Sequence, residues 1–146
     1  ALFDVLEEIH ARLPVVFPVH PRTAETIRTK LGGRSLALRT TEPLGYLEFL
    51  RLTAAARLVL TDSGGIQEET TALGVPCLTL RDNTERPVTV EQGTNRIVGN
   101  DPHAIRAEVG KILDGERRTG RVPELWDGHA AARIVDVLER DLAELR

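Results

Sequence analysis

Apolar residues recur along the chain with two spacings, and each spacing predicts one kind of element. Helical spacing predicts amphipathic helices over 2–13, 23–31, 45–56, 102–114 and 131–145. Short continuous apolar runs predict buried strands over 15–19, 35–39, 58–61, 77–80 and 95–99. Because strands and helices alternate, we expect an α/β domain in which parallel strands are layered with helices.

The same pattern predicts local details. The buried face of helix 45–56 is expected to hold Tyr46, Leu47, Leu50 and Ala54. Thr23 is expected to cap the helix that runs to Leu31, where two glycines end it. A loop is expected over 40–44. Asp101 is expected to cap helix 102–114.

The run from Leu58 to Pro87 is the most informative part of the chain. Strand 58–61 leads into a glycine turn, a helix of about two turns that closes at Gly74, and a second strand after Pro76. A strand, helix and strand in this order predict a parallel pair joined by a right-handed crossover.

The turn of this unit has the composition of a phosphate site. Gly64 and Gly65 let a ligand approach the backbone, and the unpaired N–H groups and dipole of the following helix attract an anion. Ser63 can add a hydroxyl, and Glu69 can accept hydrogen bonds from sugar hydroxyls. The alternative is an ordinary strand-to-helix turn, since the pattern is neither GxGxxG nor a Walker loop.

Four segments around this turn resemble the non-hydrolysing UDP-N-acetylglucosamine 2-epimerase family. They are Thr-Asp-Ser-Gly-Gly-Ile-Gln-Glu-Glu (61–69), Gly-Val-Pro (74–76), Arg-Asp-Asn-Thr-Glu-Arg-Pro (81–87) and Gly-Thr-Asn-Arg-Ile-Val-Gly (93–99). Val-His-Pro-Arg-Thr (19–23) and Pro-Leu-Gly-Tyr-Leu-Glu-Phe-Leu (43–50) fit the same family. The resemblance therefore covers most of the chain.

The resemblance implies a domain organisation. Members of this family form a GT-B-type clamp of two Rossmann-like domains, and residues 1–146 resemble the C-terminal, UDP-binding one. The catalytic N-terminal domain would then be absent. The opening strand of this domain and a His-Arg-Arg-Glu-like motif should lie just before Ala1. The full-length enzyme is expected to be a homodimer.

Site residues follow from the same resemblance. Ser63, Gly64, Gly65 and Arg86 are expected to hold the diphosphate of UDP, and Glu69 the ribose. A guanidinium suits a diphosphate because it is always charged and can bond two oxygens.

Alternatives to the Arg86 assignment stay open at this stage. Arg81 competes for the same role, and a salt bridge to Glu85 or Asp82 is the structural alternative.

Other segments are expected to bind the uracil base and to form a second site. Phe49 is expected to pack on uracil, with the Leu44 backbone reading the base edge, unless Phe49 is a core or half-exposed side chain. His20 and Arg22 follow strand 15–19 at the edge where α/β sheets place ligands. In relatives the matching histidine lies near a regulatory nucleotide-sugar site; the alternative is a simple helix-entry turn.

Composition narrows the classes of partner. With a net charge of −3 and 3% aromatic residues, the 146-residue chain lacks the basic surface and the stacking platform of nucleic-acid-binding proteins. The single cysteine, Cys77, lies in an apolar run and is expected to be buried and unreactive. No stretch is long enough to span a membrane and no signal-peptide pattern opens the chain, so we expect a cytoplasmic protein.

The implied activity is interconversion of UDP-N-acetylglucosamine and UDP-N-acetylmannosamine, by elimination and re-addition of UDP. No cofactor, NAD or metal is required, and the acid–base carboxylates belong to the absent domain. This segment alone is therefore expected to bind UDP without catalysing a reaction. The alternatives are a GT-B glycosyltransferase donor domain, a hydrolysing epimerase and a non-catalytic nucleotide-sugar-binding module.

Overall fold

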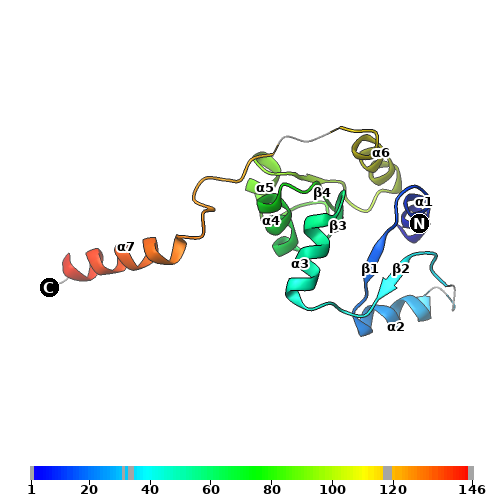
Figure 1. Cartoon of the computed structure of the whole chain (residues 1–146), viewed down its shortest axis with the longest axis horizontal. Helices are drawn as coiled ribbons and strands as arrows, with labels where there is room; N and C mark the ends of the chain where they lie inside the picture. The colour runs from blue at the N-terminus through cyan, green and yellow to red at the C-terminus, as the bar shows by residue number, and fades with distance from the viewer. Residues whose placement is uncertain (1, 31, 33–34, 117–119, 145–146) are drawn as a thin grey trace.

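The computed structural model describes residues 2–30, 32, 35–116 and 120–144, and helices alternate with strands along most of them (Figure 1). The elements are α1 (Leu2–Arg12), β1 (Val16–Pro18), α2 (Pro21–Lys30), β2 (Arg39–Thr41), α3 (Tyr46–Ala55), β3 (Val59–Thr61), α4 (Gly64–Leu73), β4 (Cys77–Thr79), α5 (Pro87–Glu91), β5 (Asn95–Ile97), α6 (Pro102–Leu113) and α7 (Ala130–Glu144). The predicted alternation of strands and helices is confirmed.

All the strand pairs are parallel, as predicted for an α/β fold. β3, β4 and β5 form one sheet in that order, with Val59 opposite Cys77 and Cys77 opposite Asn95. β1 and β2 form a separate pair in which Val16 lies opposite Arg39.

The hydrophobic core lies between the three-stranded sheet and two helices, α1 and α6, that pack against each other (Figure 1). Its buried members are Val5, Ile9, Leu78, Val98, Ile105, Val109 and Ile112. The α1 and α6 residues among them recur at helical spacing, which is why the apolar pattern predicted both helices correctly. Asp101 accepts a hydrogen bond from His103 N (3.0 Å), so the predicted cap of α6 is confirmed.

The second strand lies later in the chain than predicted. The apolar pattern placed it over 35–39, whereas β2 comprises Arg39–Thr41 and so overlaps the predicted strand only at Arg39 and extends into the predicted loop. Within the described part of the predicted strand 35–39, Leu38 is the only buried side chain. It directly precedes β2. All β2 residues are exposed, because β2 is an edge strand, and β-branched threonines suit such a position without burial.

The second helix begins earlier than predicted. α2 starts at Pro21, so Thr23 lies inside the helix and is not its cap. Proline is favoured at a first helical position because its fixed φ suits the helix and its missing N–H needs no acceptor there. Gly32 has a positive φ (59°), while Leu31 and Gly33 lie outside the described residues.

The buried face of α3 is not the one predicted. Tyr46 and Leu47 are 64% and 71% exposed and Ala54 is also exposed, whereas Thr53 is 2% exposed. α3 carries apolar residues around most of its circumference, so periodicity could not define its buried side. Contact with α4 selects the side that includes Thr53.

The last helix projects away from the rest of the chain (Figure 1). α7 has the predicted amphipathic pattern, yet no side chain described in it is buried. Its exposed apolar residues are Ile134, Val135, Val137, Leu138 and Leu142. The predicted stripe member Leu145 lies outside the described residues. Within the described ranges, no helix has the length and apolar character needed to cross a membrane.

Candidate functional site

The glycine turn lies where β3 ends and α4 begins. Ser63 is the N-cap residue with an extended backbone (φ −84°, ψ 127°), and its side chain makes no capping bond. Its N–H donates to Thr61 Oγ1 (3.1 Å), which anchors the turn to the strand. The Gln67 N–H donates to Ser63 O (3.2 Å), so the N–H groups before Gln67 precede the first turn of helical bonds. The Gly64 and Gly65 N–H groups therefore lie at the helix start, before the ladder of helical hydrogen bonds.

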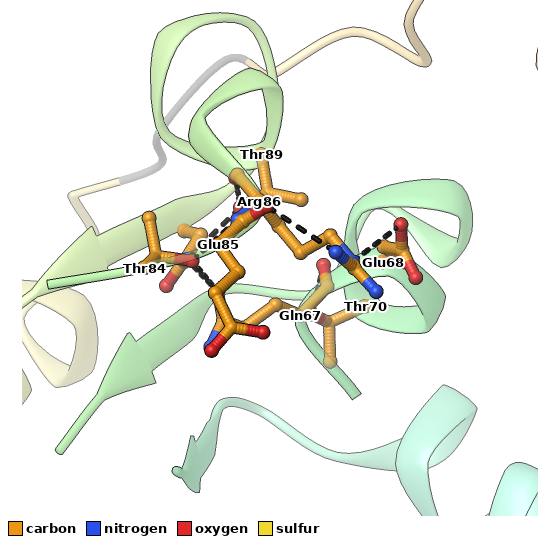
Figure 2. A network of polar contacts seen from close by, with 8 residues as sticks. Gln67, Glu68, Thr70, Thr84, Glu85, Arg86 and Thr89 are labelled. Carbon is orange, nitrogen blue, oxygen red and sulfur yellow. Dashed lines mark hydrogen bonds and ion pairs between the residues drawn. The ribbon is translucent and has the colours of Figure 1, made fainter. Parts of the chain in front are cut away.

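Arg86 lies over this helix start. A Cβ built on Gly64 would stand 3.7 Å from Arg86 Cγ and 3.8 Å from its Nε. The same Nε lies 3.0 Å from Glu68 Oε1, an ion-pair contact within α4's first two turns (Figure 2). The structure thus brings Arg86 together with the predicted glycines, and it adds Glu68, which the sequence did not identify as its partner.

The competing arginine has a different partner. Arg81 lies 3.7 Å from Glu85, so the alternative salt bridge to Glu85 forms with Arg81. Arg86 contacts Glu85 only through its backbone, with Nη1 donating to Glu85 O (3.3 Å). The Arg86 guanidinium is therefore the one held at the α4 turn.

Glu69 is half-buried on α4, one residue after the glutamate that pairs with Arg86. Residues four apart on a helix share a face, so Glu69 lies on the face of Gly65, one turn further from the helix start. This position separates Glu69 from the phosphate-binding end of the helix by about the 5.4 Å of one turn.

Leu44 and Phe49 lie at the start of α3, which packs beside α4. Both side chains are half-buried, and the Phe49 N–H donates to Gly45 O (2.9 Å) in the first turn of the helix. They belong to the element next to the glycine turn, with part of each side chain accessible.

His20 and Arg22 lie at the start of α2, beside the two-stranded sheet. Both are exposed, and His20 Nδ1 accepts a hydrogen bond from the Arg22 N–H (3.3 Å). The His20 carbonyl also accepts from Ala24 N (3.0 Å). These contacts are those of a helix-entry turn, and among the described residues β1–β2 shares no hydrogen-bond ladder with the sheet of β3, the strand that precedes Ser63.

Cys77 is buried in the central strand β4. Burial raises the pKa of its thiol to about 11, with hydrogen bonds involving Thr70 and Thr79 acting in the opposite direction. The thiolate is the reactive form of cysteine, so this thiol is unreactive near neutral pH, as predicted. The part of the chain that the structure describes contains no cluster of three or more His, Cys, Asp or Glu side chains placed to hold a metal.

A group of buried polar side chains beneath Arg86 was not predicted. Gln67, Thr79, Thr89 and Asn95 are each at most 1% exposed, and they are joined by hydrogen bonds. The sequence did carry a signal. Asn95 opens a predicted strand and Gln67 lies inside a predicted helix, and a polar residue in a buried position requires a hydrogen-bond partner.

Parallel strands layered with helices make this an α/β protein, and the solved structures that it resembles are GT-B-like. A family model described as UDP-N-acetylglucosamine 2-epimerase matches residues 1–139. The chain belongs to the UDP-N-acetylglucosamine 2-epimerase family.

Individual relatives agree with this assignment. The chain is 42% identical over 142 residues to the UDP-N-acetylglucosamine 2-epimerase of Methanocaldococcus jannaschii, covering 94% of this chain and 37% of the relative. It is 39% identical over 151 residues to the enzyme of the same name from Escherichia coli K12, covering 99% and 40%. The M. jannaschii structure in complex with UDP-GlcNAc and UDP superimposes with a TM-score of 0.75 at 39% identity, covering 94% of this chain and 39% of that one. The chain thus spans about two-fifths of the length of these relatives.

Proposed function

We propose that the full-length protein is a UDP-N-acetylglucosamine 2-epimerase and that this segment binds the UDP moiety of its substrate. One observation carries the proposal: Arg86 lies over the Gly64–Gly65 start of α4, in a family of which one member was solved with UDP-GlcNAc and UDP. The reaction would interconvert UDP-N-acetylglucosamine and UDP-N-acetylmannosamine.

The geometry suits the charge that such a reaction creates. Elimination transfers the C2 proton to a base and breaks the anomeric C–O bond, leaving a 2-acetamidoglucal and UDP; re-addition bonds UDP to C1 again and delivers a proton to the opposite face of C2, which inverts C2. The electron pair of the broken bond goes to the leaving diphosphate. N–H groups at the start of α4 and the Arg86 guanidinium would stabilise that charge without reorganisation, because both are already in place.

The remaining site residues take roles in the same proposal. Ser63, whose exposed hydroxyl makes no capping bond, would donate to a phosphate oxygen. Glu69 would bind the ribose hydroxyls, and Phe49 and the Leu44 backbone would bind uracil. His20 and Arg22 would contact a second nucleotide-sugar molecule or the substrate from α2.

The proposal also includes a further domain and the assembly of the full-length protein. A catalytic N-terminal domain would supply the acid–base carboxylates, and the working enzyme would be a cytoplasmic homodimer that needs no cofactor. Two observations support a missing part: the chain spans about two-fifths of its relatives, and the apolar face of α7 is exposed.

Calorimetric titration with UDP tests the site. The 146-residue chain is compared with a Ser63→Ala, Arg86→Ala double variant, and we expect binding that the variant loses. Equal heats for both proteins would contradict the site assignment. No binding by either folded protein would mean that the other domain completes the pocket, and the same pair is then compared in the full-length protein.

Product analysis of the full-length protein tests the reaction. An epimerase inverts C2 and retains the nucleotide, which gives UDP-N-acetylmannosamine from UDP-N-acetylglucosamine. Transfer of the sugar to an acceptor would indicate a glycosyltransferase instead. Free N-acetylmannosamine would indicate a hydrolysing epimerase, and UDP binding without turnover would indicate a binding module.

A further inference from the structure

The backbone of Arg86 is held on both sides by threonine hydroxyls. The Arg86 N–H donates to Thr84 Oγ1 (2.9 Å), and the Arg86 carbonyl accepts from Thr89 Oγ1 (2.7 Å) (Figure 2). Arg86 directly precedes α5 and Pro87, so these two bonds define where the side chain leaves the loop.

Both hydroxyls are tied to buried amides. Thr84 Oγ1 donates to Gln67 Oε1 (2.5 Å), and Thr89 Oγ1 accepts from Asn95 Nδ2 (3.0 Å). Asn95 Nδ2 also donates to Gln67 Oε1 (3.1 Å), which closes a ring of hydrogen bonds through Gln67, Thr84, Arg86, Thr89 and Asn95. Each hydroxyl donates once and accepts once, and the Asn95 amide nitrogen uses both of its hydrogens, so every donor that forms the ring is used.

The ring connects the arginine to the helix that it faces. Gln67 belongs to α4, and the next residue, Glu68, contacts the Arg86 Nε from the same helix (3.0 Å). Gln67, Thr89 and Asn95 are at most 1% exposed, so they cannot touch a ligand at the surface turn. Any effect of theirs on a ligand must be transmitted through Arg86 or through α4 itself.

We infer that Gln67, Thr84, Thr89 and Asn95 are positioning residues that fix the Arg86 backbone, so that its side chain leaves the loop over the start of α4, where a diphosphate would bind. This inference rests on the proposed UDP site. Its physical basis is pre-organisation: an arginine whose backbone is already fixed loses less conformational freedom when the ligand binds.

Thr84 is the residue to change, because it is only half-buried and the fold tolerates its substitution better than that of Gln67. In the full-length protein, Thr84→Val removes the hydroxyl at nearly constant volume. We expect the Kd for UDP to rise about tenfold, because the variant loses the bond from the Arg86 N–H and the bond to Gln67 Oε1, together with the order that they impose. The Kd for uridine, which has no phosphate, should be unchanged, and Thr84→Ser should restore UDP affinity to within about threefold of the wild type.

A double-mutant cycle separates positioning from general stability. In an Arg86→Ala background, Thr84→Val should change the Kd for UDP less than about twofold, because the side chain it positions is gone. Thr29→Val, which removes a hydroxyl that donates to Glu25 O on exposed α2, is the matched control and should leave UDP binding unchanged.

The outcomes distinguish an error in the positioning role from an error in the UDP site itself. An equal effect of Thr84→Val with and without Arg86, or an equal loss of uridine and UDP affinity, would overturn the positioning role while leaving the UDP site intact. Failure of the wild-type protein to bind UDP would overturn the proposed function and this inference with it.

Discussion

At the scale of single residues, the important feature of the glycine turn is that Gly64 has no side chain. Gly64 does not have a positive φ, so its backbone is open to other residues and strain does not explain the glycine. A side chain at this position would instead stand between Arg86 and the helix start, within 3.7 Å of Arg86 Cγ. The absence of a Cβ at Gly64 therefore keeps a side chain out of the space between Arg86 and the helix start.

This interpretation predicts a specific loss from Gly64→Ala. The variant should weaken UDP binding by at least about tenfold, because the new methyl group occupies the space that a phosphate would take. Its stability should not fall, since 3.7 Å is an ordinary contact distance and alanine favours a helix more than glycine does. Calorimetry with UDP and thermal unfolding measure the two effects.

Gly110→Ala is the matched control. Gly110 lies inside α6, and a Cβ built there meets nothing within 4 Å. This variant should gain stability, by at most about 1 kcal/mol, with UDP binding unchanged. A Gly64→Ala protein that binds UDP as tightly as Gly110→Ala does would contradict our placement of the phosphate.

At the scale of elements, the apolar pattern predicted the buried faces of α1 and α6 correctly and that of α3 wrongly. α1 and α6 each show apolar residues on one side, and that side is buried. α3 has apolar residues on several sides, and its buried face depends on where α4 lies. β2 was misplaced for a related reason, because an edge strand with all residues exposed has no apolar signature.

An ion pair at the start of α7 predicts that the stability of this helix start depends on pH. Asp127 accepts a hydrogen bond from the His129 N–H (3.0 Å) and forms an ion pair with Arg133, one turn into the helix. The hydrogen bond from Arg133 is the largest cause, followed by the bond from the His129 N–H, and together they lower the pKa of Asp127 to about 2. A carboxylate with a lowered pKa in the folded state adds stability above its unfolded pKa and loses it as the pH falls through the folded value.

We therefore expect the start of α7 to lose stability between about pH 4, the unfolded pKa of aspartate, and pH 2. An NMR titration of the Asp127 carboxyl carbon should show a midpoint near 2. In an Arg133→Gln variant the midpoint should shift upward toward its ordinary value, because the guanidinium that stabilises the carboxylate is removed. A midpoint that is the same in both proteins would show that the ion pair does not form in solution.

At the scale of the whole molecule, the described strands form two sheets with unused edges. β1 pairs only with β2, and β3 pairs only with β4 on its one side, within the part of the chain that the structure describes. One further parallel strand between β1 and β3 would join the two sheets into a single one. The family resemblance predicts such a strand just before Ala1, at the start of the domain.

A chain extended at its N-terminus to include that strand should unfold at a higher temperature than the 146-residue chain. We expect an increase of roughly 10 °C, since burial of a strand contributes several kcal/mol and about 1 kcal/mol shifts the midpoint by 2–4 °C at this size. The control is an extension of equal length with two prolines in the strand, which cannot donate to the ladder. Equal midpoints for the extended chain and its proline control would contradict the joined sheet.

The sequence alone determined the features that depend on neighbours along the chain. A strand, two glycines and a helix closed by Gly74 follow one another within 17 residues, and Gly74 has the positive φ of a helix end (70°). The family segments lie in the same local stretches, which is why the fold class and the α4 turn could be predicted from the order of residues.

Only the tertiary structure decided which residues far apart in the sequence meet. The pairing of Glu68 with Arg86, and the ring that joins Gln67 to Asn95, link α4 to the loop before α5 and to β5. Side-chain hydrogen bonds and ion pairs need atoms within about 3 to 4 Å, and periodicity does not give distances between separate elements. The position of the binding turn was therefore a local property, and the means by which its arginine is held was a property of the fold.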